Sequence, residues 1–175
     1  MSVLARKRGL SSLEFYKNAI VLRNKITRLL LRDLGLKKTV RNMRLNTKEM
    51  TEADYIVWNN INQKYGFSRI PGDYPEWLIE KLRTSIWDIT RDLMLNITRA
   101  YTVWATTRAE ADLRRVSQDK AIADCESLLK ELELAIDVLP VDAEKYMQYT
   151  EIIDKEIALL KGWRKSDNKR NKTLK

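Results

Sequence analysis

Basic side chains recur on one side of the segment 12–34 at the spacing of a helix. Placing residues 100° apart around the axis puts four cations within an arc of roughly 80°, namely Lys17, Lys25, Arg28 and Arg32. Only one acid, Glu14, shares that arc, whereas a solvated helix face usually alternates acids with bases. Lys and Arg donate charge-assisted hydrogen bonds to phosphate oxygens. The stripe therefore favours phosphate binding, and a solvated helix face is the alternative.

Positive charge is concentrated at both ends of the chain. Residues 1–46 have a net charge of +10, residues 161–175 have +6, and the segment 47–160 between them has −7. Two basic ends around an acidic middle indicate a surface that meets a polyanion. The candidate nucleic-acid-binding residues are Arg6, Lys7, Arg8, Lys17, Lys25, Arg28, Arg32, Lys37, Lys38, Arg41, Arg44, Lys161, Arg164, Lys165, Lys169 and Arg170.

The residues needed for several other chemistries are missing. The chain contains no histidine, which excludes His-dependent general bases, catalytic triads and most zinc or di-iron sites. Neither a Gly-rich phosphate loop nor a nucleophile-elbow motif occurs. The single cysteine, Cys125, has acidic neighbours that raise the pKa of a thiol, so we expect a core residue rather than a nucleophile. We predict no enzymatic activity, no cofactor and no metal site.

Apolar residues recur at three- and four-residue intervals in four long segments, which predicts four amphipathic helices over residues 12–34, 76–104, 107–139 and 142–165. Thr107 and Glu110 have the spacing of a capping box, and Pro140 stops the third helix. Because very short connections join the last three helices, we predict an all-α, up-down-up-down four-helix bundle within a single domain, residues 1–165. The first and fourth helices would then be neighbours, and the two basic ends could form one continuous face. Residues 166–175 are expected to form a basic flexible tail.

Residues 36–74 form an elaborated connection between the first two long helices. Thr51 and Asp54 resemble a capping box, so we expect a short extra helix from there to about Lys64, ended by Gly66. The stretch 65–75 contains two Gly and two Pro, which predicts a loop.

Several large side chains have an ambiguous place in this pattern. Trp77 and Trp104 share the core side of the second long helix, whereas Trp87 indicates either an interface or a wide core. We expect Trp163 to pack against the core, with base stacking beside the basic tail as the alternative. Arg23 falls inside the apolar arc of the first helix, so it must snorkel, pair with an acid or lie at an interface.

No segment has the length of a membrane span or the apolar core of a signal peptide, so we expect a cytoplasmic protein that makes no membrane contact. The surplus of apolar residues and the aromatics outside the apolar stripes indicate self-association.

Short stretches of the chain resemble a known superfamily. The opening of the first helix, residues 13–23 (LEFYKNAIVLR), is similar to the entry of the four-helix-bundle superfamily that includes the 23S rRNA intervening-sequence proteins. The stretch 157–165 (IALLKGWRK) resembles the last helix of its retroelement branch, in which a Leu-x-x-Trp element precedes a basic tail. Together with residues 121–125 (AIADC), these motifs resemble the accessory variability determinant proteins of diversity-generating retroelements.

This resemblance implies a small non-catalytic bundle that assembles as a ring-like pentamer. Such a protein binds the reverse transcriptase and the template RNA of its element and supports mutagenic cDNA synthesis. The basic residues of the first helix and of the tail would face RNA or an RNA/DNA hybrid. The segment 36–74 is longer than the compact family members need. The alternatives are a structural adaptor bundle that docks on an acidic protein and a bundle associated with the ribosome or rRNA.

Overall fold

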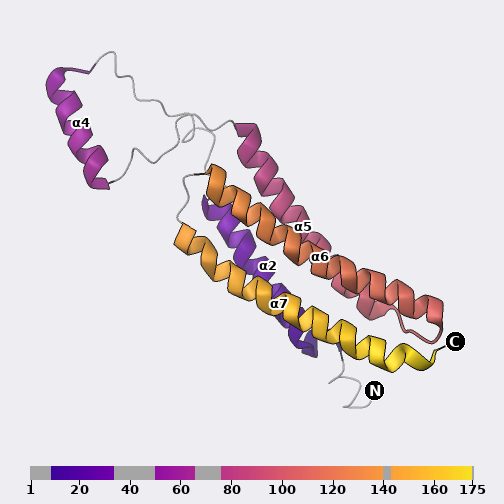
Figure 1. Ribbon diagram of the computed structural model, residues 1–175. Coiled ribbons are helices and arrows are strands. Elements are labelled where there is room, and N and C mark those ends of the chain that lie inside the picture. Colours follow the sequence, from indigo (N-terminus) through magenta and orange to yellow (C-terminus); the bar gives the residue numbers. More distant parts are fainter. Residues whose placement is uncertain (1–8, 34–49, 66–75, 140–142, 175) are drawn as a thin grey trace.

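The computed structural model describes residues 9–33, 50–65, 76–139 and 143–174, and every regular element among them is helical (Figure 1). The long helices are α2 (Glu14–Asp33), α5 (Glu76–Thr102), α6 (Arg108–Val138) and α7 (Ala143–Arg170), and a shorter helix is α4 (Glu52–Tyr65). Single 3-10 turns, η1 (Leu10–Ser12) and η4 (Asn171–Thr173), lie before α2 and after α7. The predicted all-α class is confirmed for the described residues.

Each long helix packs against two others. Helix α5 lies against α6, α6 against α7, and α2 against both α5 and α7, so the four helices enclose a shared core (Figure 1). This packing buries most of the apolar arcs predicted from periodicity, whereas Ile20, Leu31 and Val116 are exposed. Residues exposed by 1% or less include Leu22, Ile26, Leu29, Ile86, Leu93, Ile97, Cys125, Leu128, Ile153 and Leu160. Burial raises the pKa of the Cys125 thiol, which agrees with a core role for this residue.

Short polar motifs fix where two of the helices begin. The Thr107 side chain accepts a hydrogen bond from the backbone N–H of Glu110, whose carboxylate accepts from the backbone N–H of Thr107, so the predicted capping box is confirmed. Hydrogen bonds from the Thr106 side chain and backbone lower the pKa of Glu110 to about 2. At the start of α4, Asp54 accepts from the N–H and hydroxyl of Thr51, and the Asp54 N–H donates back to the Thr51 hydroxyl oxygen. The predicted motif at this helix is therefore confirmed as well.

The predicted short helix between the first two long helices exists as α4, and it stands away from the four long helices (Figure 1). Most of its described side chains are exposed. The rest of the predicted connection, residues 36–49 and 66–74, lies outside the described residues.

The tryptophans of the second long helix differ from their predicted positions. Trp77 is 64% exposed and Trp104 is 82% exposed, so neither belongs to the core. Helix α5 ends at Thr102, and Trp104 therefore follows the helix, where a helical period no longer applies. Trp87 is half-exposed, and the guanidinium carbon of Arg23 lies 5.7 Å from the centre of its ring. A cation–π contact thus accommodates the arginine that the sequence placed inside an apolar arc.

Candidate nucleic-acid interface

Cations gather along one side of α7 near its C-terminal end. They surround an open groove with a cavity volume of about 600 Å³. Its lining residues recur every three or four positions, at 161, 164/165, 168/169 and 172, so they project from one side of α7 and of the η4 turn that follows it. We call this surface the α7-tip groove, and it is lined by Lys161, Arg164, Lys165, Asn168, Lys169 and Lys172.

Two of the five cations in the α7-tip groove are neutralised by acids of α6. Arg164 Nη1 donates to Asp119 Oδ1, and Lys161 Nζ lies 3.7 Å from Glu126 Oε1. The other three form no ion pair with any described residue, and they are Lys165, Lys169 and Lys172. The groove therefore keeps an excess of positive charge on a solvent-facing surface, which is the electrostatic condition for binding a polyanion.

A buried polar network holds the end of α7 against α6. Asp167, only 5% exposed, accepts at Oδ2 from Arg114 Nε at 2.6 Å and from Gln118 Nε2 at 2.8 Å. The same guanidinium donates through Nη1 to the Val103 carbonyl at 2.9 Å and lies 5.3 Å from the ring centre of Trp163. One arginine thus joins the α5–α6 connection, α6 and α7 beneath the groove.

Trp163 has the packing role that we expected from the sequence. Its ring stacks on Phe15 of α2, with ring centres 4.3 Å apart and planes inclined by 11°. Because Phe15 covers the indole and the Arg114 guanidinium lies over it, we assign Trp163 to packing rather than to base stacking.

The predicted flexible tail differs from the observed end of the chain. Helix α7 continues past Ser166 to Arg170, and η4 extends to Thr173. The physical reason is Asp167, the only acid among residues 161–175, whose buried ion pair with Arg114 fixes the last turns of the helix. Consequently Lys165 and Lys169 are presented by a helix, whereas Arg170 pairs with Asp167.

A second group of cations lies on α2, and we call it the α2 cluster. Its members Lys17, Lys25 and Arg28 are exposed and form no ion pair with any described residue. Arg32 lies in the last turn of the same helix. The remaining predicted binding residues are Arg6, Lys7, Arg8, Lys37, Lys38, Arg41 and Arg44, and they lie outside the described residues.

Among the described residues, the predicted continuous basic face is divided into two groups of cations. Asn18 of α2 donates to the Ile152 carbonyl at 3.1 Å and to Glu156 Oε2 at 2.8 Å. Later residues of α2 therefore lie progressively farther from the C-terminal end of α7. Arg28 lies thirteen residues beyond Phe15, which corresponds to about 20 Å along the helix axis. The α7-tip groove is turned toward α6, because Arg164 pairs there. The two groups of cations therefore occupy different flanks of α7.

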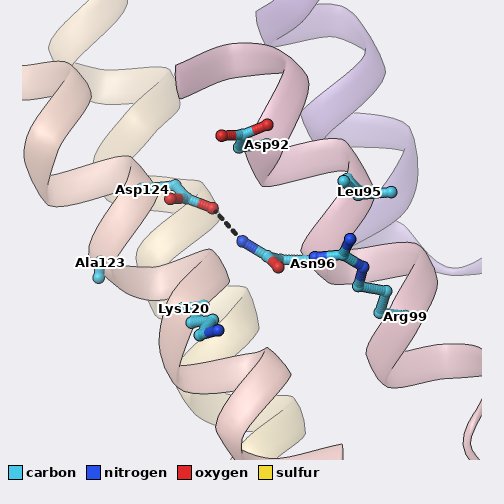
Figure 2. Close-up of a pocket in the computed structure, with 7 residues that line it drawn as sticks. All are labelled: Asp92, Leu95, Asn96, Arg99, Lys120, Ala123 and Asp124. Atoms are coloured by element: carbon cyan, nitrogen blue, oxygen red, sulfur yellow. Dashed lines mark hydrogen bonds between the residues drawn. The ribbon is translucent and has the colours of Figure 1, made fainter. Parts of the chain in front are cut away.

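A second polar pocket lies between α5 and α6 (Figure 2). Its volume is about 430 Å³, and Asn96 Nδ2 donates across it to Asp124 Oδ2 at 2.7 Å. Burial raises the pKa of the Asp124 carboxyl, and the hydrogen bond from Asn96 opposes this shift. Asp92 and Asp124 balance the charges of Arg99 and Lys120, so this pocket suits a polyanion less well than the α7-tip groove does. No group of potential metal ligands occurs among the described residues.

Sequence reasoning missed residues that build and support the α7-tip groove. Lys172 and Asn168 continue the helical spacing of Lys161 and Lys165, and that spacing could have found them had the helix been extended past residue 165. Arg114 and Asp167 had no comparable signal, because a charged residue in an amphipathic pattern is normally assigned to solvent.

No protein-family model matches the chain, and neither the curated proteins nor the solved structures include a significant match. Within the described helices, none combines the length and the apolar character that crossing a membrane requires.

Proposed function

We propose that the chain is a cytoplasmic, non-catalytic RNA-binding accessory subunit that partners a reverse transcriptase, as the resemblance of its first and last helices implies. In this proposal the long helices form an up-down-up-down bundle, the bundle self-associates, and RNA or an RNA/DNA hybrid lies along the α7-tip groove. The observation that supports RNA binding most strongly is a groove with three lysines, Lys165, Lys169 and Lys172, that lack an acidic partner among the described residues.

The extent of the groove favours a polymer with repeated charges over a small anion. From Lys161 to Lys172, along α7 and the η4 turn, the chain rises by about 16 Å, so the cations of the groove are spread over a distance that a single phosphate does not cover. Phosphate contacts of this kind provide affinity without reading base sequence. We therefore infer that the groove positions RNA and that any sequence preference arises elsewhere.

Neutralising the groove tests the proposal directly. We expect Lys165→Gln, Lys169→Gln and Lys172→Gln together to weaken the binding of single-stranded RNA. The slope of log affinity against log salt concentration should also become less steep, by about 0.7 for each phosphate that the variant no longer binds. Fluorescence anisotropy over a salt series provides both the affinity and its slope. The matched control neutralises three lysines outside the groove, Lys81, Lys120 and Lys130, and should change affinity much less. Equal losses of affinity in the two variants would show that only net charge matters.

Competition separates RNA from an acidic protein as the occupant of the groove. We expect unlabelled RNA to displace the labelled RNA at a far lower concentration of negative charges than polyglutamate does. Equal competition would favour the adaptor alternative.

The proposed partner is open to a separate test. A gene for a reverse transcriptase, with paired template and variable repeats, should neighbour the gene for this chain, and the two proteins should copurify after coexpression. A neighbourhood without a reverse transcriptase gene would contradict the partner while leaving RNA binding intact.

A further inference from the structure

Helix α4 exposes apolar side chains on a helix that stands apart from the bundle (Figure 1). Tyr55, Ile56 and Val57 are each more than half exposed, and Ile61 is 38% exposed. A helix of 14 residues is marginal in water by itself, and most helical stability in proteins comes from packing an apolar side against another surface. Of these residues, Val57 and Ile61 lie four positions apart on one side of the helix, and α4 therefore needs a surface to cover that side.

The bundle has an apolar groove of suitable character between α2 and α5. Its cavity volume is about 390 Å³, and we call it the α2–α5 groove. Leu31 is 71% exposed and Trp87 is 40% exposed at its edge, so water contacts large apolar surfaces there. The lining residues are Thr27, Leu30, Leu31, Arg83, Thr84 and Trp87. Within the described part of the chain, both the helix and the groove thus leave apolar surface uncovered.

The charges of the helix and the groove are complementary. Helix α4 begins with two acids, Glu52 and Asp54, and hydrogen bonds from Thr51 lower the pKa of Asp54, so it is ionised at neutral pH. Arg83 lines the groove and has no acidic partner among the described residues, and Arg23 lies over the ring of Trp87, another residue of the groove. Opposite charges at the two surfaces would steer and orient docking of the helix.

We propose that α4 of one copy of this chain docks in the α2–α5 groove of a second copy. Val57 and Ile61 then cover Leu31 and Trp87, while the acidic start of α4 meets Arg83. A second copy is the occupant because α4 stands away from α2 and α5 of its own chain (Figure 1). Exchange of an element between identical chains is a low-cost route to an oligomer. This inference deepens the self-association included in the proposed function, and it does not depend on RNA binding.

Cysteine cross-linking between separately prepared copies tests the exchange. One sample carries Ile61→Cys and a larger, tagged sample carries Thr84→Cys, and the two are mixed under mild oxidation. We expect a disulfide-linked mixed dimer on a non-reducing gel. The unmodified chain should form none, because its single cysteine, Cys125, is buried. Absence of the mixed dimer would overturn the proposal, and so would a double variant that forms its disulfide only within one chain.

Charge substitutions on opposite sides of α4 test the same contact through the mass of the assembly in solution. We expect Ile61→Asp to weaken self-association by about tenfold or more, since it places a carboxylate against apolar groups. Asn59→Asp adds the same charge on the other side of the helix and should leave association nearly unchanged. Sedimentation or light scattering over a concentration series reports both. A chain that is monomeric at all concentrations, or equal effects of the two variants, would refute α4 docking. Because neither substitution lies in the α7-tip groove, RNA affinity measured on the same samples shows separately whether the proposed function fails.

Discussion

Helix α7 buries two carboxylates in very different surroundings. Asp167 near its end is 5% exposed and accepts hydrogen bonds from Arg114, Gln118 and Arg170. Glu156 in its middle is fully buried, accepts at one oxygen from Asn18, and has no partner for Oε1 among the described residues. Burial raises the pKa of Glu156 to about 7, against the effect of the Asn18 hydrogen bond, whereas Asp167 has a buried cation beside it. The difference shows that the partners of a buried charge, rather than its burial, decide whether it stabilises the fold.

The largest expected effect comes from breaking the well-partnered site. Asp167→Asn leaves the guanidinium of Arg114 buried without a counter-charge, which typically costs about 3 kcal/mol or more of unfolding free energy. Denaturant unfolding measures this loss, and hydrogen exchange should speed up most over residues 164–172. Asp154→Asn, an exposed acid on the same helix, is the matched control and should change stability little. A comparable loss in both variants would mean that the buried pair has no special role.

A smaller, pH-dependent effect is expected at the poorly partnered site. The pKa of Glu156 is raised from 4.5 to about 7 in the folded protein, so the folded state holds the proton more tightly than the unfolded state does. The cost of ionising buried Glu156 is therefore absent below about pH 4.5 and lowers the stability of the folded protein as pH rises to 7. Relative to the unmodified chain, Glu156→Gln should gain stability by up to about 3 kcal/mol across this window, at about 1.4 kcal/mol per pKa unit. Parallel stability profiles for the two proteins would show that Glu156 ionises as easily folded as unfolded.

The smallest expected effect separates the buried partner of Asp167 from its exposed one. The side chain of Arg170 is 66% exposed, so solvent screens its ion pair with Asp167. Arg170→Ala should cost less than about 1 kcal/mol by denaturant unfolding, well below the loss from Asp167→Asn. If the two losses were equal, the exposed arginine rather than Arg114 would be what fixes the end of α7.

The regular features of the fold could be predicted from the sequence because each depends on residues close together in the chain. The apolar periods located the long helices, and the spacing of Thr107 and Glu110 located the start of α6. Failures occurred where distant residues decide the outcome. The end of α7 depends on Arg114, which is 53 residues away from Asp167, and no local pattern reveals such a partner.

The candidate site could be predicted in part for the same reason. The basic character of the last helix is visible in its composition, whereas the flank on which its cations lie depends on how α7 meets α6. Asp119 of α6 pairs with Arg164 and thereby fixes the side of α7 on which the groove opens. Trp77 and Trp104 illustrate the limit of periodicity, because Trp77 lies in the first turn of α5 and Trp104 lies beyond its last residue, where a residue can match the apolar spacing and still face water.

The long sequence separation of the Arg114–Asp167 pair also has a kinetic consequence. Because 53 residues separate its partners, the pair can form only after α6 and α7 have already come together. An interaction made late in folding is absent from the transition state, so it slows unfolding without accelerating folding. We therefore expect the pair to govern how long the end of α7 stays folded rather than how quickly it folds.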